Sequence, residues 1–321
     1  MATERSKRET IFPGSTQWSR TLGSESRRES KSSIPGPSTL APHREDKRPM
    51  RRINLPVNPI GSNRDHLVPV KEGSPWKYYK YAYDLELGGS VAIVCKTPAT
   101  NKLFAMHSIS GQNSEREQKL YTLRQLNHEN LLRPEEILSF KDSFYIISEC
   151  AAISLEEVIV VRPSEVQLAA IVHQLLDVIC YLLSQNLKHG SLNRANILLT
   201  TEGVVKIANF ENCSTIAVPE DQLIDIRAMG ALMRDLMGED SDTVSSTGTS
   251  LLPKQPTNWS TEAVDFLALT MVASGSELAK HPFLESAPYI HELVPLIGLA
   301  QVSACRLYSL RNSYMHVSFS A

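Results

Sequence analysis

The chain has 321 residues, 42% of them hydrophobic, so it is large and apolar enough to bury a sizeable core. Its net charge of −2 is uneven, because residues 1–72 carry about +6 and the remainder about −8. The five cysteines are odd in number and widely spaced, which argues against a disulfide framework or a zinc knuckle and predicts buried, reduced thiols. They are Cys95, Cys150, Cys180, Cys213 and Cys305.

Membrane insertion and secretion find no support in the sequence. The longest apolar run, Leu293–Cys305, is too short to span a bilayer. The first residues are polar and contain no apolar signal core. We therefore expect a cytoplasmic or nuclear protein without a membrane span.

Residues 1–76 are rich in Ser, Arg, Lys, Pro and Glu and poor in aromatic residues. Such a segment cannot bury enough apolar surface to offset its ordering entropy, so we predict a disordered tail. The basic cluster at residues 47–52 fits a nuclear import signal or a contact with an anionic surface. It fits a solvated basic run equally well.

Alternating and branched apolar residues predict five strands and one helix between residues 77 and 150. The helix, Ser114–Asn127, has a candidate N-cap in Ser114 and leucines three residues apart. The predicted strands are Tyr78–Leu87, Ser90–Lys96, Lys102–Ile109, Glu136–Phe140 and Phe144–Glu149.

After residue 150 the pattern becomes mainly helical, with a leucine-rich stripe along the longest helix. A Ser/Thr/Gly-rich stretch at 238–257 is predicted to be a loop. The predicted helices are Ile153–Ile159, Ser164–Gln185, Asp221–Met237 and Thr261–Ala273.

Residues 187–211 interrupt the helices with a predicted hairpin, Ile197–Leu199 and Val204–Ala208, around the turn Glu202-Gly203. The pattern His189-x-x-Leu192-x-x-x-Asn196-Ile197-Leu198-Leu199 precedes Asn209-Phe210-Glu211. Residue types, order and spacing resemble the catalytic loop of protein kinases followed by their Asp-Phe-Gly triplet. The match is nearer to the serine/threonine class than to the tyrosine class.

This resemblance implies an α+β, two-lobed protein-kinase-like fold with a small β-rich N-lobe and a larger helical C-lobe. The expected domain covers residues 77–298, divided into lobes at 77–150 and 151–298. Residues 1–76 form the expected disordered tail, and residues 299–321 are left as a C-terminal tail without a placed structure.

The N-lobe groups that handle phosphates in the family are degenerate. Of the Gly-rich loop, expected near residues 85–92, only Gly88 and Gly89 remain. His107 takes the place of the third-strand lysine, and an unperturbed histidine is mostly neutral at pH 7. Lys119 takes the place of the helix glutamate. Lys96, on the neighbouring strand, is the candidate replacement for the lost lysine.

The resemblance also places two uncharged residues where the family has aspartates. Ser191 stands at the catalytic Asp, and a hydroxyl cannot accept a proton as a carboxylate does. Asn209 stands at the metal-binding Asp, whereas Asn196, the family's second metal ligand, is kept. We therefore expect no catalytic set and no metal site.

The residues that are kept have structural roles in the family. His189 and Phe210 resemble members of its apolar inter-lobe column, with Leu123 as a third member, and Asp225 is expected to hydrogen-bond the catalytic-loop backbone. At the lobe linker, the backbone of Glu149 and Ala151 would face an adenine. ATP binding would then be weak at most, with Asn196 and Asn209 as its other contacts.

The resemblance thus implies a catalytically inactive kinase-like protein, a pseudokinase. It would act by binding another protein, such as an active kinase or its substrate, as a scaffold or allosteric regulator in phosphorylation signalling, with no nucleic-acid partner. The alternative is a serine/threonine kinase that binds ATP and uses relocated catalytic groups.

Overall fold

The computed structural model describes residues 67–98, 101–111, 113–238, 259–285 and 290–317, with side chains described up to residue 305. The chain divides into two compact units, and every described residue belongs to the second, Ile53–Ala321. The predicted disordered tail up to residue 66, with the basic cluster at 47–52, lies outside the described residues. So does the predicted loop, except Gly238.

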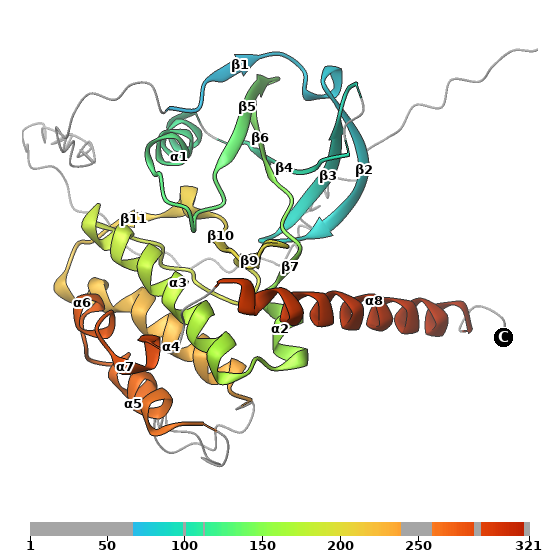
Figure 1. Ribbon diagram of the computed structural model, residues 1–321. Coiled ribbons are helices and arrows are strands. Elements are labelled where there is room, and N and C mark those ends of the chain that lie inside the picture. Colours follow the sequence, from blue (N-terminus) through green and yellow to red (C-terminus); the bar gives the residue numbers. More distant parts are fainter. Residues whose placement is uncertain (1–66, 99–100, 112, 239–258, 286–289, 318–321) are drawn as a thin grey trace, which may run out of the picture. The chain divides into compact units, whose positions relative to one another are not determined.

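A six-stranded sheet forms the N-terminal part of this unit, in the order β1-β5-β6-β4-β3-β2 (Figure 1). β1 runs parallel to β5, whereas the other neighbours are antiparallel. The strands are β1 Val70–Glu72, β2 Tyr79–Glu86, β3 Ser90–Lys96, β4 Leu103–Ile109, β5 Pro134–Phe140 and β6 Ser143–Glu149. The five strands predicted from alternation are thus confirmed.

Helix α1, Asn113–Gln125, is the predicted N-lobe helix, shifted by one or two residues at its ends. Leu120, Leu123 and the following Leu126 are buried because their three-residue spacing places them on one side of the helix. That side contacts the short helix η3, Phe210–Asn212, which belongs to the C-terminal part. Leu123 and Phe210 lie in one hydrophobic core cluster, as expected for the inter-lobe column.

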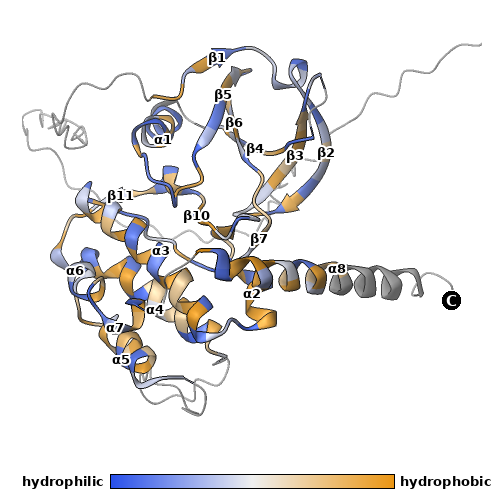
Figure 2. Cartoon of the chain, viewed as in Figure 1, coloured by the Kyte–Doolittle hydropathy of each residue, from blue (hydrophilic) through white to orange (hydrophobic). Residues whose placement is uncertain are grey.

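The C-terminal part is built around α3, a helix with eleven buried residues that begins at a Ser164 capping box. Figure 2 shows hydrophobic residues gathered along α3, α4 and α5, where these helices share a core. The elements are β7 Ile153–Ser154, α2 Leu155–Val161, α3 Glu165–Ser184, β8 Leu187–Lys188, β9 Ile197–Leu199, β10 Val205–Ile207, β11 Ser214–Thr215, η4 Pro219–Leu223, α4 Ile224–Leu236, α5 Thr261–Leu269, α6 Gly275–Leu278, α7 Pro282–Glu285, η6 Ile290–Glu292 and α8 Leu293–Val317.

Several predicted boundaries are wrong. Order begins before residue 77, because β1 pairs with β5 and the 3-10 helix η2, Pro75–Lys77, follows it. Ile153 belongs to a strand, since β7 pairs with β9 and Ser154 then caps α2. The C-terminal tail expected from residue 299 is part of α8, which packs on α2 and β7 (Figure 1).

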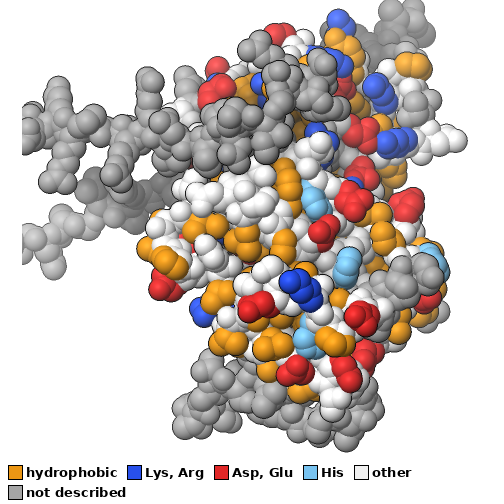
Figure 3. Space-filling view, turned by 60° about the vertical axis from the view of Figure 1, so that its left-hand side comes forward, with side chains coloured by type: hydrophobic (Ala, Val, Ile, Leu, Met, Phe, Trp, Pro, Cys, Tyr) orange, Lys and Arg blue, Asp and Glu red, His pale blue; other side chains and the backbone are white. Residues whose placement is uncertain are grey.

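The predicted hairpin is confirmed, with β9 and β10 antiparallel. The five cysteines are free, as predicted, although four are half-buried and Cys305 is exposed. Among the described residues, α3 is the one helix long and apolar enough to cross a membrane, but most of that apolar stretch is buried in the core. The face in Figure 3 mixes acidic and basic side chains without an extended basic area.

Candidate functional site

The apolar residues above and below the inter-lobe cleft pack together into one buried cluster. From the N-terminal part it contains Leu87, which follows β2, and the strand residues Val91 and Ala105. Leu198 and Ala208 join it from the C-terminal part. All five side chains are less than a tenth exposed. All of these residues except Leu198 also line the cavity that remains in the cleft.

The linker residues expected to face an adenine lie at the edge of this cluster. Ala151 is buried within it. Glu149 ends β6, and its carboxylate forms an ion pair with Lys206 at 2.9 Å between Nζ and Oε1. Neither residue lines the cavity that remains in the cleft.

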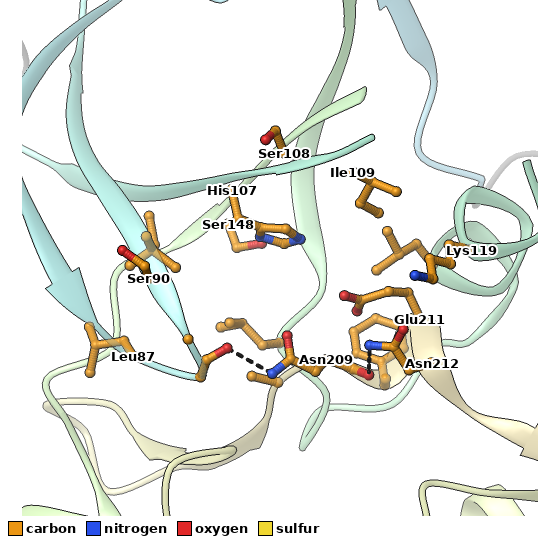
Figure 4. A pocket seen from close by; sticks show the side chains of 18 of the residues that line it. Leu87, Ser90, His107, Ser108, Ile109, Lys119, Ser148, Asn209, Glu211 and Asn212 are labelled. Carbon is orange, nitrogen blue, oxygen red and sulfur yellow. Dashed lines mark hydrogen bonds between the residues drawn. The ribbon is translucent and has the colours of Figure 1, made fainter. Parts of the chain in front are cut away.

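Asn209 joins the two sides of the cleft. Its Nδ2 donates to the carbonyl oxygen of Gly88 at 2.7 Å and to Oδ1 of Asn196 at 2.9 Å (Figure 4). The backbone of Asn209 is left-handed, with φ 62°, a conformation that asparagine tolerates better than most residues. One neutral side chain thus connects the remnant of the Gly-rich loop to the catalytic-loop segment.

Gly88 approaches the C-terminal part closely enough to require the absence of a side chain. A Cβ on Gly88 would lie 2.6 Å from the Cβ of Ala208, and its φ of 71° is left-handed. The loop backbone therefore rests directly on the segment that contains Asn209.

Asn196 and Ser191 are also engaged with neighbouring groups. Asn196 Nδ2 donates to the Ser191 carbonyl at 2.8 Å, while its Oδ1 accepts from Asn209. His189 Nε2 lies 3.0 Å from the Ala208 carbonyl, which only accepts, so Nε2 carries the proton. His189 Nδ1 then accepts from the Ser191 hydroxyl at 3.3 Å.

Asp225 holds the segment that carries these residues. Its carboxylate accepts from the backbone N–H groups of His189 at 2.6 Å and Gly190 at 2.8 Å. Asp225 is 1% exposed, so these charge-assisted bonds form in a shielded environment. The geometry expected for Asp225 is confirmed.

His107 points from β4 into the cleft without a hydrogen-bond partner for its buried Nε2 among the described residues. Burial lowers the pKa of His107 to about 4, so its imidazole is neutral at pH 7. The buried Ser148 Oγ on β6 is likewise unpartnered. A buried polar group without a partner typically costs about 1–3 kcal/mol of stability.

Lys119 does not contact His107. It forms an i,i+4 ion pair with the exposed Glu115 at 2.8 Å and lies beside Glu211 on the same side of the cavity (Figure 4). Burial raises the pKa of Glu211, and the positive charge of Lys119 opposes that shift. In the family the helix supplies an acidic side chain to the cleft. Here helix α1 supplies a cation, Lys119, and the acidic side chain beside it is Glu211 of η3.

Lys96 does not replace the missing lysine. Lys96 is exposed at the end of β3 and does not line the cavity. Its positive charge is instead one of the groups that help to lower the pKa of Glu136. Lys119 is the only lysine or arginine among the residues that line the cavity, so one permanent positive charge is available to a triphosphate there. Within the described ranges, no group of three His, Cys, Asp or Glu side chains could hold a metal ion. The residues present do not fit a magnesium nucleotide.

A family model of the protein kinase domain matches residues 86–228, the segment from the Gly88 loop through Asp225. This match supports assignment of the segment, which is under half of the chain, to the protein kinase superfamily. This kinase-like domain follows the family in its two-part α+β architecture, its hairpin and the Asp225 contacts. It departs from the family at the charged positions His107, Lys119, Ser191 and Asn209.

Several similar curated proteins are named serine/threonine-protein kinases. Serine/threonine-protein kinase pakC of Dictyostelium discoideum is 24% identical over 305 residues, covering 77% of this chain and 62% of the relative. TOS3 of Saccharomyces cerevisiae is 25% identical over 205 residues, covering 56% and 36%. CBL-interacting serine/threonine-protein kinase 17 of Arabidopsis thaliana is 30% identical over 135 residues, covering 41% and 30%. The chain spans less than two thirds of each.

Sequence reasoning missed two features of the site. Gly88 is predicted only as a remnant of a phosphate loop, whereas its carbonyl accepts from Asn209. The role of Glu211 became visible only when η3 was placed beside the cavity. An uncharged residue at position 209 was the one signal in the sequence that pointed to a changed contact across the cleft.

Proposed function

We propose that this domain is a pseudokinase that acts by binding another protein, as a scaffold or allosteric regulator in phosphorylation signalling. The bond of the Asn209 amide to Gly88 and Asn196 carries the proposal, because it joins the groups that a magnesium nucleotide would have to separate. A cytoplasmic or nuclear location remains a prediction.

The chemistry of phosphoryl transfer supports this proposal. Transfer depends on positioning and on positive charge or metal around the phosphates. His107 is neutral, Ser191 offers a hydroxyl bonded to His189, and Asn209 uses its amide N–H groups within the protein. Loss of a positioned base alone typically lowers the rate by about 10²–10⁴-fold.

The exposed side of α1 is the surface we assign to the partner, which would be an active kinase or its substrate. Glu117, Tyr121 and Gln125 are exposed and lie four residues apart, so they form one stripe along the helix. The opposite side of α1 rests on η3, next to Asn209. The affinity of a protein that contacts this stripe would therefore depend on whether the cleft is closed.

Activity is tested first, with the purified full chain, labelled ATP, Mg²⁺ or Mn²⁺, and both generic substrates and captured partners. We expect no phosphate transfer above a heat-treated control. Transfer at a rate ordinary for kinases, about 1–100 s⁻¹, that is lost in Asn196→Ala would establish the alternative of an active kinase.

Binding is tested by quantitative affinity capture with three chains: the wild type, Tyr121→Ala/Gln125→Ala, and the control Val272→Ala. Val272 is 74% exposed and lies in the C-terminal part, away from α1. We expect the α1 variant alone to lose a partner, with direct binding then measured between purified proteins. Equal capture by all three chains would refute the assigned surface.

A further inference from the structure

Helix α8 is apolar on both of its sides over residues 293–305, the part whose side chains are described. This stretch contains no Asp, Glu, Lys, Arg or His. Its inner side packs on α2, α3 and β7, and four of its residues are at most 3% exposed: Leu293, Leu296, Ile297 and Ala300. A helix that is apolar all round is ordinarily buried all round. We therefore expect the outer side of α8 to be covered.

The outer side of α8 is open in the single chain. Val294 is 42% exposed, Leu299 62% and Val302 53%, and these positions recur along one side of the helix. Val160 on α2, against which α8 packs, is 56% exposed. Figure 2 shows this part of α8 coloured mainly as hydrophobic. Single exposed apolar residues are normal on a protein surface, but a continuous apolar strip marks an interaction site.

Gly298 lies in the middle of this outer side. It follows Val294 by four residues and precedes Val302 by four, so the three residues form one ridge along the helix. A Cβ on Gly298 would meet no neighbouring atom within 4 Å, so the single chain has no packing reason for glycine there. Glycine also weakens the interior of a helix. A second helix that crosses at Gly298 explains the residue, because two backbones can then approach closely.

We infer that the outer side of α8 binds the same surface of a second copy of this chain, with the two helices antiparallel and crossing near Gly298. The ridge is self-complementary in this arrangement, because Val294 of each copy meets Val302 of the other, as a two-fold interface requires. Ridges of residues four apart interdigitate in the commonest class of helix contact.

The charges at the two ends of the stretch favour the same arrangement. Glu292 precedes the apolar residues and Arg306 follows them. An antiparallel pair brings Glu292 of one copy towards Arg306 of the other, whereas a parallel pair sets like charges together. A membrane surface fits less well, because helices that lie on membranes carry a basic polar side, whereas the second side of α8 is apolar and packed on the core.

The contact should be weak because the stretch is short. Residues 293–305 extend over about 20 Å of helix. Stable interfaces bury about 800 Å² on each partner, and smaller ones belong to transient complexes. We therefore expect dimers that form at micromolar or higher concentration. The dimer surface is separate from the exposed stripe of α1 proposed above, and neither needs the other.

Sedimentation equilibrium of the full chain, from micromolar to submillimolar concentration, tests for the dimer. We expect the wild type to pass reversibly from monomer to dimer. Leu299→Asp should weaken dimerisation by about tenfold or more, because it places a charge in the apolar contact. Val272→Asp is the matched control, since Val272 is 74% exposed and lies outside α8, and it should leave dimerisation unchanged.

Gly298→Gln separates loss of the contact from loss of folding. Glutamine is a better helix former than glycine, and its side chain would extend from a Cβ that meets no neighbouring atom. The dilute monomer should therefore unfold at the same temperature or higher. The same side chain would hold two helices apart, so dimerisation should weaken several-fold.

Charge reversal tests the antiparallel arrangement. Glu292→Lys and Arg306→Glu should each weaken the dimer by a few-fold, and the two together should restore it. Failure of the double variant to regain affinity would overturn the arrangement. A wild-type chain that stays monomeric over the whole range would overturn the inference itself, whether or not α8 then binds vesicles or another protein. Equal effects of Leu299→Asp and Val272→Asp would overturn it too.

Discussion

The Nδ2 atom of Asn209 lies 2.7 Å from the carbonyl oxygen of Gly88 and donates a hydrogen bond across the cleft. The same amide donates to Asn196 Oδ1, so both of its N–H groups are used inside the protein. Because the contact needs a donor, the aspartate that the family has at this position could not make it. The substitution that removes a metal ligand thus also creates the bond that closes the cleft.

Replacement of this amide by a carboxylate should open the cleft. Asn209→Asp removes two donors and sets a negative charge against the oxygens of Gly88 and Asn196, so we expect a loss of about 1–3 kcal/mol in the free energy of unfolding. Urea denaturation measures it. Asn186→Asp, at an exposed position whose backbone is also left-handed, is the control. Equal stability of Asn209→Asp and the wild type would contradict the role given to this bond.

The effect of the close approach between Gly88 and Ala208 on stability can be measured separately from the effect of the left-handed backbone at Gly88. Gly88 and Gly89 both have positive φ, but only at Gly88 would a Cβ meet another atom, Ala208 Cβ at 2.6 Å. Both alanine variants should be strained, and Gly88→Ala should lose about 1–3 kcal/mol more because of the added overlap. Thermal or urea unfolding compares them. Equal losses would mean that the loop does not rest on Ala208.

Asp225 should matter for stability even in a protein without catalysis. Asp225→Ala leaves the backbone N–H groups of His189 and Gly190 without their carboxylate, and bonds to charged groups contribute about 1.5–3 kcal/mol each. We therefore expect severe destabilisation in chemical denaturation. Asp84→Ala, which removes only an exposed bond from Tyr81, should be nearly silent. A stable Asp225→Ala chain would show that the loop is held by other contacts.

Burial of His107 predicts a dependence of stability on pH. The pKa of His107 is about 4 in the fold, below its ordinary value of 6.5. Between these values the unfolded chain binds the proton and the folded chain does not, so stability is complete above pH 6.5 and falls as pH drops toward 4. The loss for this group amounts to about 3 kcal/mol.

His107→Leu should flatten this slope in unfolding experiments between pH 6.5 and 4.5, because the leucine takes up no proton. His173→Gln provides the control, since His173 is exposed on α3. His189, whose pKa burial also lowers, contributes the same slope to all the chains and cancels in the comparison. A slope unchanged by His107→Leu would place its imidazole in contact with water.

Much of the architecture could be predicted because it depends on local patterns. Strand alternation located β2 to β6, leucine spacing located α1, and the motif around His189 located the hairpin. The element ends were less certain: β1 is three residues long and recognisable only by its pairing with β5. The ordered start of α8 depends on packing against α2, which no local pattern in residues 293–305 reveals.

The sequence predicted which family residues are missing from the candidate site, but not which contacts take their place. The positions of His107, Lys119, Ser191 and Asn209 followed from the motif spacing. The bond to Gly88 links residues 121 positions apart, and the cavity wall combines two strands with α1 and η3. Contacts of this range depend on how the two parts close on each other, which residue types alone do not determine.

The most direct test of the closed cleft is the melting temperature of the full chain with saturating ATP, measured with and without Mg²⁺. Binding to the folded state raises stability by RT ln(1 + [L]/Kd), about 2.7 kcal/mol at a concentration of 100 Kd. A cleft whose Gly88 loop is held by Asn209, and whose lining offers one lysine, predicts the same melting temperature in both conditions. A magnesium-dependent rise that disappears in Asn196→Ala would contradict it.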